Sequence, residues 1–248
     1  MDNEERLGGG NATHRVTRAG ATVRKPWTEA SPSVAAYMTA LRLAGIDVPE
    51  HLGQDEQGRQ VLEFIPGRLA MHSESLTPNE LARVGALVRA IHDVSATYRP
   101  AVDAVWQTAI VARGTDLVCH NDLAPWNLIV GDRWVFIDWD SAAPSTRLWD
   151  VAYAAQTFTL SNPTEEPEHA AINLAAFVDG YNADYSLRVD LPAALHRRVM
   201  AMYDLLESSH RSGTEPWASM FSSGHGDHWR AVTEYVARHQ EMWVRAVL

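Results

Sequence analysis

Cysteine is nearly absent from this sequence: Cys119 is the only one among 248 residues. A single thiol cannot form an internal disulfide. Long apolar runs are absent as well, and residues 1–6 lack the basic start and apolar stretch of a secretory signal. We therefore expect a cytoplasmic protein with no membrane partner, in which Cys119 is a buried strand residue.

Basic residues are scarce too. Lysine and arginine number 21 against 31 acidic residues, which gives a formal net charge of -10. Nucleic-acid binding draws its affinity from clustered basic side chains, so this balance argues against a nucleic-acid partner. An anionic ligand would have to be bound through a local cation, backbone N–H groups or a metal ion. The excess acid would suit a cationic small molecule, although solubility explains it equally well.

Four polar residues gather in one short, mostly apolar stretch: His120, Asp122, Asn127 and Asp138. The first three fit the frame H-x-D-x-x-x-x-N of a kinase catalytic loop. Phosphoryl transfer needs a carboxylate at the attacking hydroxyl and oxygen ligands for magnesium. The pattern predicts Asp122 as catalytic base and Asn127 with Asp138 as Mg²⁺ ligands. His120 is expected to orient the loop backbone.

The residues between Asn127 and Asp138 predict a β-hairpin. Apolar strips at 128–130 and 134–137 flank the polar corner 131–133, as two short strands joined by a tight turn do. Such a hairpin brings Asn127 beside Asp138. Each of these polar residues alone is more often a turn or surface residue, but all of them in register favour the phosphoryl-transfer interpretation.

A possible phosphate-binding loop lies near the N-terminus, where Gly9 and Gly10 belong to a glycine run. Backbone N–H groups there can approach phosphates, although such a run is more often a flexible tail. Two strands are expected next, and Lys25 ends the second one. Lys25 is the candidate cation for the α- and β-phosphates, and Arg24, on the opposite face, is the alternative.

The chain changes character near residue 67. Before it we expect short strands and one helix that begins with Ser31 as N-cap and buries an apolar stripe ending at Leu43. A strand then runs into Pro66-Gly67, and the backbone of Glu63 and Ile65 is positioned to pair with adenine. Residues 1–66 are thus predicted to form a nucleotide-binding lobe.

Residues 67–248 are predicted to form a mainly helical catalytic and substrate-binding lobe. A capping box starting at Thr77 opens an amphipathic helix that ends near His92, which is expected to cap it. Further helices are expected from residue 149 and at the ranges 168–181, 192–210 and 226–248.

The chain resembles the aminoglycoside phosphotransferase family over nearly its whole length. The resemblance is carried by residues 63–67, 120–127, 136–140 and 148–152. It implies an α+β, two-lobed protein-kinase-like fold with a small β-rich N-terminal lobe and a larger, mainly helical C-terminal lobe. It also implies ATP- and Mg²⁺-dependent transfer of the γ-phosphate to a small-molecule hydroxyl, with Asp122 as base and Asp150 supporting the catalytic loop from beneath.

One departure from kinases of this fold concerns the partner of Lys25. Such kinases hold the phosphate-binding lysine with a glutamate from the first long helix, yet residues 33–43 contain no acid. Glu29, just ahead of that helix, is a possible substitute. The alternative function is a catalytically weak or inactive nucleotide-binding pseudokinase with a regulatory role. A metal-dependent phosphoester hydrolase is a third and weaker alternative.

The acceptor is expected between the catalytic loop and the C-terminal helices. Acids and tryptophans there, among them Trp229 and Trp243, suit an amine such as an aminoglycoside-like antibiotic or an amino alcohol. Tryptophans at helical spacing are, however, more often core residues. The sequence does not choose among an aminoglycoside, a macrolide, a choline-like amine, a sugar and an amino alcohol, and it leaves the oligomeric state open.

Overall fold

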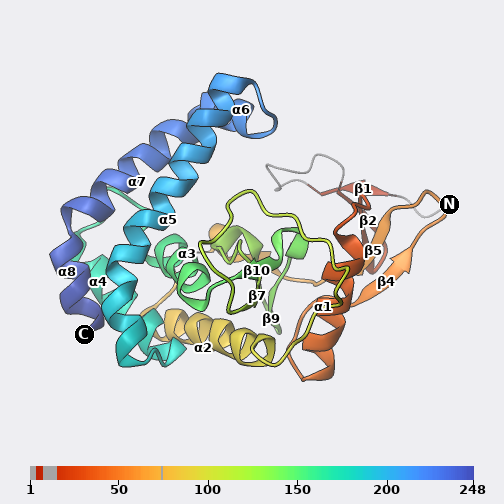
Figure 1. Ribbon diagram of the computed structural model, residues 1–248, viewed down its shortest axis with the longest axis horizontal. Helices are drawn as coiled ribbons and strands as arrows, with labels where there is room; N and C mark the ends of the chain where they lie inside the picture. Colours follow the sequence, from red (N-terminus) through yellow and green to blue (C-terminus); the bar gives the residue numbers. More distant parts are fainter. Residues whose placement is uncertain (1–3, 8–15, 74) are drawn as a thin grey trace.

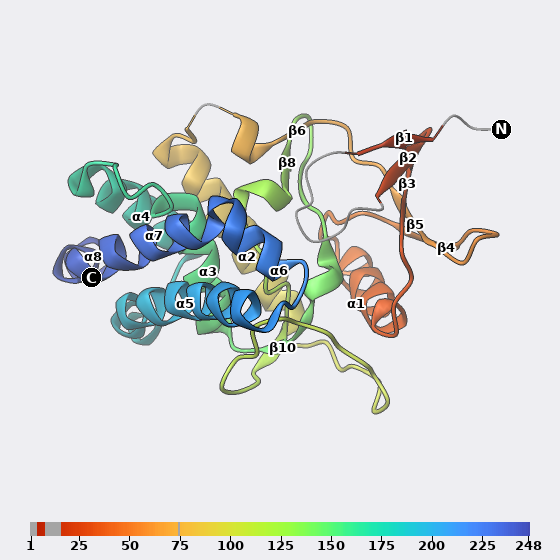
Figure 2. The ribbon, with the colours of Figure 1, turned by 90° about the horizontal axis from the view of Figure 1, so that it is seen from above.

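The computed structural model describes residues 4–7, 16–73 and 75–248. A small antiparallel sheet and one helix lie at one end of the molecule, and a group of long helices lies at the other (Figures 1 and 2). A short β-hairpin and the loop before it lie between them. This arrangement confirms the predicted α+β class, with a small β-rich N-terminal region and a mainly helical C-terminal part.

The N-terminal sheet has five antiparallel strands in the order β1-β2-β3-β5-β4. Their bounds are β1 (Glu5–Arg6), β2 (Thr17–Ala19), β3 (Thr22–Lys25), β4 (His51–Gln54) and β5 (Gln60–Glu63). The predicted pair of strands corresponds to β2 and β3. Gly20 joins them at φ +60°, a conformation that glycine adopts without strain. Strands β1 and β4 are short and partly polar, and the sequence pattern did not predict them.

Helix α1 (Ser31–Leu43) follows the first three strands and buries one apolar face. Tyr37 and Leu41 are completely buried there, whereas Leu43 is 85% exposed. The prediction of the buried stripe is therefore wrong at Leu43. Leu43 follows Leu41 by two positions, and side chains two positions apart on a helix point to different sides. The predicted N-cap is wrong as well. Ala30 precedes the helix, and the Ser31 hydroxyl accepts a hydrogen bond from the Thr28 N–H at 2.9 Å.

Helix α2 (Pro78–Ser95) begins with the predicted capping box. The Thr77 N–H donates to the Glu80 carboxylate at 2.8 Å, and the Glu80 N–H donates to the Thr77 hydroxyl at 3.4 Å. The helix packs against α4 (Pro167–Tyr181) with unusually close backbones. A Cβ on Gly85 would lie 2.2 Å from the Phe177 carbonyl oxygen, and one on Gly180 would lie 2.0 Å from that of Ala82. Only glycine allows this contact.

Two small sheets follow, and the three-stranded one contains the central hairpin. They consist of β7 (Leu117–Cys119) with β10 (Ala143–Ser145), and of β6 (Arg68–Leu69), β8 (Leu128–Val130) and β9 (Trp134–Phe136). Leu128 pairs with Phe136 and Val130 with Trp134, so the predicted hairpin is confirmed. Residues 96–116 join α2 to β7 without a helix or strand.

The C-terminal helices form the other end of the molecule, where α5 and α7 lie side by side (Figures 1 and 2). Their bounds are α3 (Arg147–Thr159), α5 (Tyr185–Ser212), α6 (Trp217–Met220), α7 (Gly226–Arg238) and α8 (Gln240–Val247). The helix predicted at 192–210 starts earlier, because the Asp184 carboxylate caps it by accepting from the Leu187 N–H at 2.8 Å. The helix predicted at 226–248 is interrupted at His239.

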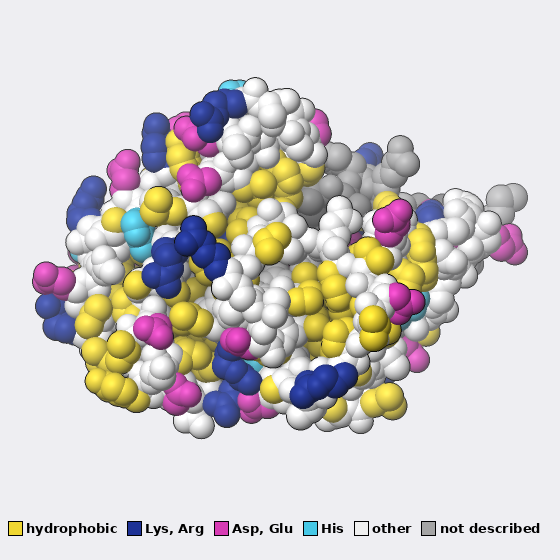
Figure 3. All heavy atoms as spheres, viewed as in Figure 1, with side chains coloured by type: hydrophobic (Ala, Val, Ile, Leu, Met, Phe, Trp, Pro, Cys, Tyr) yellow, Lys and Arg dark blue, Asp and Glu magenta, His cyan; other side chains and the backbone are white. Residues whose placement is uncertain are grey.

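Within the described ranges, none of the helices combines the length and apolar character that crossing a bilayer would require. On the face shown in Figure 3, the acidic and basic side chains of the described residues are interspersed and do not form one continuous area of a single sign.

Candidate active site

The loop between β7 and β8 brings Asp122 and Asn127 into direct contact. The Asn127 amide nitrogen donates to the Asp122 backbone carbonyl at 2.9 Å and to its carboxylate at 2.7 Å. A short 3₁₀ turn, η2 (Pro125–Asn127), folds the chain back so that these side chains meet. The side-chain oxygen of Asn127 is an acceptor only, so it is the atom of this amide that could bind a cation.

Asp138 lies next to Asn127 because the hairpin pairing continues beyond its strands. The Ile137 N–H donates to the Asn127 carbonyl at 2.8 Å. Asp138 itself adopts the left-handed region at φ +62°, which is uncommon for a residue other than glycine. A 3₁₀ turn, η3 (Trp139–Ser141), follows. The predicted convergence of Asp122, Asn127 and Asp138 is thus present in the geometry.

The three side chains offer a set of oxygen donors from a carboxylate, an amide and a second carboxylate. Hard divalent cations such as Mg²⁺ and Ca²⁺ prefer such ligands. The Asp138 carboxylate is 39% exposed, so an ion can reach it. The residues present therefore fit a divalent cation held by Asn127 and Asp138.

Lys25, the last residue of β3, reaches this cluster. It is only 5% exposed, and its ammonium group forms ion pairs with Asp138 and, at 2.6 Å, with Asp140. Burial lowers the pKa of Lys25, but the two carboxylates more than offset this and raise it above its usual value. The same ammonium holds the pKa of Asp138 below its usual range, against the opposing effect of burial. Arg24 points to the other face, where it pairs with Asp55 at 3.5 Å.

A fully buried histidine fixes the backbone of the loop. His120 accepts from the Asp122 N–H at 3.2 Å through Nδ1, and its Nε2 lies 3.1 Å from the Ile137 carbonyl oxygen, to which it donates. Burial lowers the pKa of His120, which favours this neutral form. Both ring nitrogens are engaged, so the geometry gives His120 an orienting contact and no free nitrogen for proton transfer.

Asp150 supports the loop from α3. It is 1% exposed, and its Oδ1 accepts from the Asn121 N–H at 2.9 Å. Its Oδ2 lies 3.0 Å from His92 Nε2, and His92 Nδ1 lies 2.9 Å from the Tyr181 hydroxyl. The prediction that His92 caps its helix is wrong: α2 continues to Ser95, and the ring is buried. In the sequence, the position of His92 in the last turn of α2 does not indicate that its ring contacts Asp150 on α3.

Cys119 lies beside this buried link. Within the described part of the chain, His92, Cys119 and Asp150 are the one group of at least three His, Cys, Asp or Glu residues whose ligand atoms all lie within 4.8 Å of one another. Both nitrogens of His92 and both oxygens of Asp150 already form hydrogen bonds, so the group is a support for the loop. Burial raises the pKa of the Cys119 thiol, which makes it unreactive.

Asp122 has an altered acidity. Burial and the nearby Asp138 carboxylate raise its pKa to about 7, whereas hydrogen bonds from Tyr153 and Asn127 and the charge of Arg198 act in the opposite direction. Arg198 comes from α5 and is 4% exposed; its guanidinium lies 3.9 Å from the centre of the Tyr153 ring. Neither residue was predicted, because no local spacing connects them to the catalytic loop.

The residues predicted to bind the rest of a nucleotide are only partly described. Gly9 and Gly10 lie outside the described residues. The Glu63 N–H donates to the Glu50 carbonyl at 2.8 Å, so this amide is not available to a base. The Ile65 N–H has no hydrogen-bond partner among the described residues, and its side chain packs with Ile129 of the hairpin.

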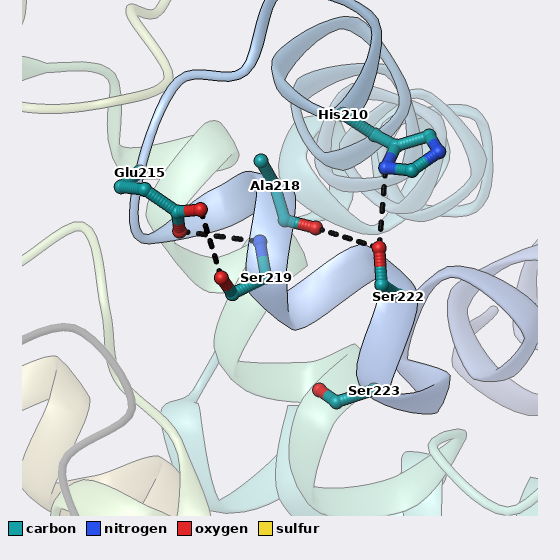
Figure 4. Close-up of a pocket in the computed structure, with 6 residues that line it drawn as sticks. All are labelled: His210, Glu215, Ala218, Ser219, Ser222 and Ser223. Carbon is teal, nitrogen blue, oxygen red and sulfur yellow. Dashed lines mark hydrogen bonds between the residues drawn. The ribbon is translucent and has the colours of Figure 1, made fainter.

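A separate hollow lies on the C-terminal helices, with a volume of roughly 360 Å³ (Figure 4). His210, Ser222 and Glu215 line it. The Ser222 hydroxyl lies 3.2 Å from His210 Nδ1, and the Glu215 carboxylate accepts from the Ser219 hydroxyl at 2.8 Å. None of the residues around Asp122 lines this hollow. Trp229 and Trp243, considered for the acceptor site, are 4% and 0% exposed and belong to the core.

Residues 101–194 match the sequence profile described as the phosphotransferase enzyme family, and this range contains the catalytic loop and the hairpin. The predicted resemblance is confirmed. The matched family consists of phosphotransferase enzymes, in agreement with the expectation of a kinase. Among curated proteins, the trifolitoxin immunity protein of Rhizobium leguminosarum bv. trifolii is 28% identical over 151 residues. That match spans 58% of this chain and 58% of the relative, a little over half of each.

Several solved structures of small-molecule kinases have a similar fold. A microcompartment-associated aminopropanol kinase aligns at a TM-score of 0.69 and 13% identity, covering 99% of this chain and 94% of its own. An amicoumacin kinase in complex with AMP-PNP and Ca²⁺ aligns at a TM-score of 0.67 and 13% identity, covering 95% of this chain and 88% of its own. A spectinomycin phosphotransferase in complex with ADP aligns at 0.65 and 14%, covering 97% and 93%.

Proposed function

We propose that this phosphotransferase-family protein transfers the γ-phosphate of ATP, in the presence of Mg²⁺, to a hydroxyl group of a small molecule. The observation that carries the proposal is the contact of Asn127 with the Asp122 carboxylate, beside an Asp138 that is ion-paired to a buried lysine. A base, two oxygen ligands and a cation thus meet at one place, as phosphoryl transfer requires.

Each residue has a distinct part in this reaction. Asp122 accepts the proton of the attacking hydroxyl, and the hydrogen bond from Asn127 holds its carboxylate in one orientation. Lys25 supplies positive charge for the α- and β-phosphates. Asn127 and Asp138 would hold Mg²⁺, which neutralises charge on the phosphate oxygens when bound. Gly9 and Gly10 remain our candidates for the phosphate loop, and the backbone carbonyl of Glu63 and the backbone N–H of Ile65 remain our candidates for the adenine site.

The lobe boundary near residue 67 and the cytoplasmic location also remain predictions. We favour the cytoplasm because ATP is available there. For the acceptor we propose a hydroxyl compound that carries an amine. The names of the similar kinases, with aminopropanol and spectinomycin as substrates, support this class. The core positions of Trp229 and Trp243 exclude those two rings from an amine-binding cage.

The test is a screen of purified protein with Mg²⁺ and ATP for acceptor-dependent ADP release. The panel contains aminopropanol, ethanolamine, choline, spectinomycin and aminoglycosides. Trifolitoxin is included because the name of the curated relative links it to protection against that toxin. We expect one class to stimulate ADP release, with a phosphorylated product detected by mass spectrometry. Tight ATP binding with no product from any acceptor would instead support the pseudokinase alternative, which the acid-free α1 motivates.

The acidity of Asp122 predicts a pH dependence. Only the ionised carboxylate accepts a proton, and its pKa is about 7, so kcat/KM for ATP is expected to rise as the pH rises through about 7 and then level off. Tyr153→Phe removes a hydrogen bond that favours the ionised form, so the inflection is expected to move to higher pH. Tyr185→Phe, at a side chain 77% exposed, is the matched control. A wild-type profile that is flat across this range would contradict the assignment of Asp122 as base.

A further inference from the structure

Helix α1 contains no acidic residue, so another group must hold Lys25 in place. The Lys25 ammonium pairs with Asp138 and Asp140, and the structure gives it no other ion pair among the described residues. Glu29, the substitute considered from the sequence, is exposed and forms no ion pair with Lys25 in that part of the chain. We propose that Asp140 is a positioning residue that holds Lys25 toward the nucleotide phosphates in place of the missing helix acid. This inference rests on the proposed function.

The turn that carries Asp140 is held rigidly by the residue between the two aspartates. Trp139 is 2% exposed, and its Nε1 donates to the Phe136 carbonyl at 2.9 Å. Its ring lies 5.7 Å from that of Tyr37 on α1 and 4.4 Å from that of His120, centre to centre. With Trp139 fixed in the core, both flanking carboxylates reach the same ammonium group.

The two carboxylates differ in what else they have to do. Asp138 contacts Lys25 through Oδ1, and Asp140 through Oδ2. A divalent cation held by Asn127 and Asp138 would compete with Lys25 for the Asp138 carboxylate. The metal ion and the Lys25 ammonium are both positively charged and are both attracted to this carboxylate. Asp140 is the partner that Lys25 retains when this happens. Its charge therefore keeps the ammonium beside the metal while the phosphates bind.

Helix α1 itself is held by contacts that do not involve Lys25. The Tyr37 hydroxyl donates to the Val118 carbonyl of β7 at 2.9 Å, and the Val105 N–H donates to the Ser33 hydroxyl at 2.9 Å. In kinases with a helix glutamate, the lysine pair also reports the position of that helix. Here the anchor of Lys25 lies on the same turn as the metal ligand Asp138, so the orientation of Lys25 is coupled to the metal site and not to α1.

The experiment is a double-mutant cycle on nucleotide binding with Mg²⁺ present. Affinity for AMP-PNP is measured by calorimetry at a saturating Mg²⁺ concentration for the wild type, Asp140→Asn, Lys25→Met and the double variant. We expect Asp140→Asn to weaken binding about tenfold in the wild-type background, the effect of losing one charged hydrogen bond. In the Lys25→Met background the same change should not weaken binding, and removing a negative charge near the phosphates should even strengthen it.

Asp132→Asn is the matched control, because it removes an exposed acid from the tip of the same hairpin and should leave AMP-PNP affinity unchanged. Affinity for Mn²⁺ alone, followed by electron paramagnetic resonance, separates the anchor from a metal ligand: Asp140→Asn should retain it. Equal weakening of AMP-PNP binding in both backgrounds, no weakening in either, or a loss confined to Mn²⁺ affinity would each overturn the inference. A wild type that binds no AMP-PNP would refute the proposed function itself.

Discussion

Asp122→Asn is expected to reduce kcat by about a thousandfold or more while AMP-PNP affinity stays within about twofold of the wild type. The amide has the shape of the carboxylate but cannot accept the proton of the attacking hydroxyl. We expect nucleotide binding to rely on the Lys25 side chain and on backbone groups, so it should not need the Asp122 charge. Steady-state kinetics with the best acceptor and calorimetry with AMP-PNP are the two measurements.

The same variant is expected to be more stable than the wild type at alkaline pH. Folding raises the pKa of Asp122 from 3.8 to about 7, so the folded state disfavours its ionised form. The advantage of Asp122→Asn should therefore be small below pH 3.8, grow as the pH rises, and level off above about 7. We expect about 2 kcal/mol at about pH 8, less than the full shift because the side chain is not completely buried.

Urea unfolding of both proteins at several pH values measures this difference. Glu80 is not suitable as a control, because its carboxylate closes the capping box of α2. Asp132→Asn is suitable, since it makes the same chemical change at an exposed position at the tip of the hairpin. Retained turnover by Asp122→Asn would refute the base assignment, and a stability difference that falls with rising pH would refute the raised pKa.

The local parts of this site followed from the sequence. The spacing from His120 to Asn127 and the apolar strips of the hairpin are short-range patterns, and the structure brings Asn127 beside Asp122 and Asp138 as those patterns predicted. The capping box of α2 was equally local. Such features depend on residues a few positions apart, so neither the rest of the fold nor a partner helix is needed to recognise them.

Features built from distant segments did not follow from the sequence. Arg198 reaches Tyr153 from another helix, and His92 meets Asp150 across 58 positions of the chain. The start of α5 was missed for a different reason. Pro192 resembles the first residue of a helix, where proline is favoured, but Asp184 caps the chain earlier and Pro192 lies inside the helix.

Asp140 lies between these two cases. The sequence showed it two residues after Asp138 and showed that residues 33–43 have no acid. The link between the two facts needed the position of the Lys25 ammonium, which the register of β3 in the N-terminal sheet determines. The acid that α1 lacks and the carboxylate of Asp140 thus concern the same lysine, Lys25. Only the fold shows this, because the two segments are far apart in the sequence.

Asp150→Ala is expected to destabilise the protein by about 3 kcal/mol, because it leaves the Asn121 N–H and His92 Nε2 buried without an acceptor. The Asn121 backbone is left-handed at φ +63°, and without this hydrogen bond the catalytic loop should relax. A shift of Asp122 by about 1 Å is enough to lower kcat by about a hundredfold. The KM for ATP should change much less, because Asp150 lies beneath the loop.

Asp150→Asn is the informative comparison for this prediction. Its side-chain oxygen can still accept from the Asn121 N–H, whereas its amide nitrogen faces His92 and requires the other tautomer of that ring. We therefore expect a stability loss of about 1 kcal/mol and a smaller drop in kcat. Urea unfolding and steady-state kinetics on both variants give the ranking. If Asp150→Ala proved as stable and as active as Asp150→Asn, the hydrogen bond to Asn121 would not be what holds the loop. The neutral His120, through its contacts to Ile137 and Asp122, would then be sufficient to hold the loop in place.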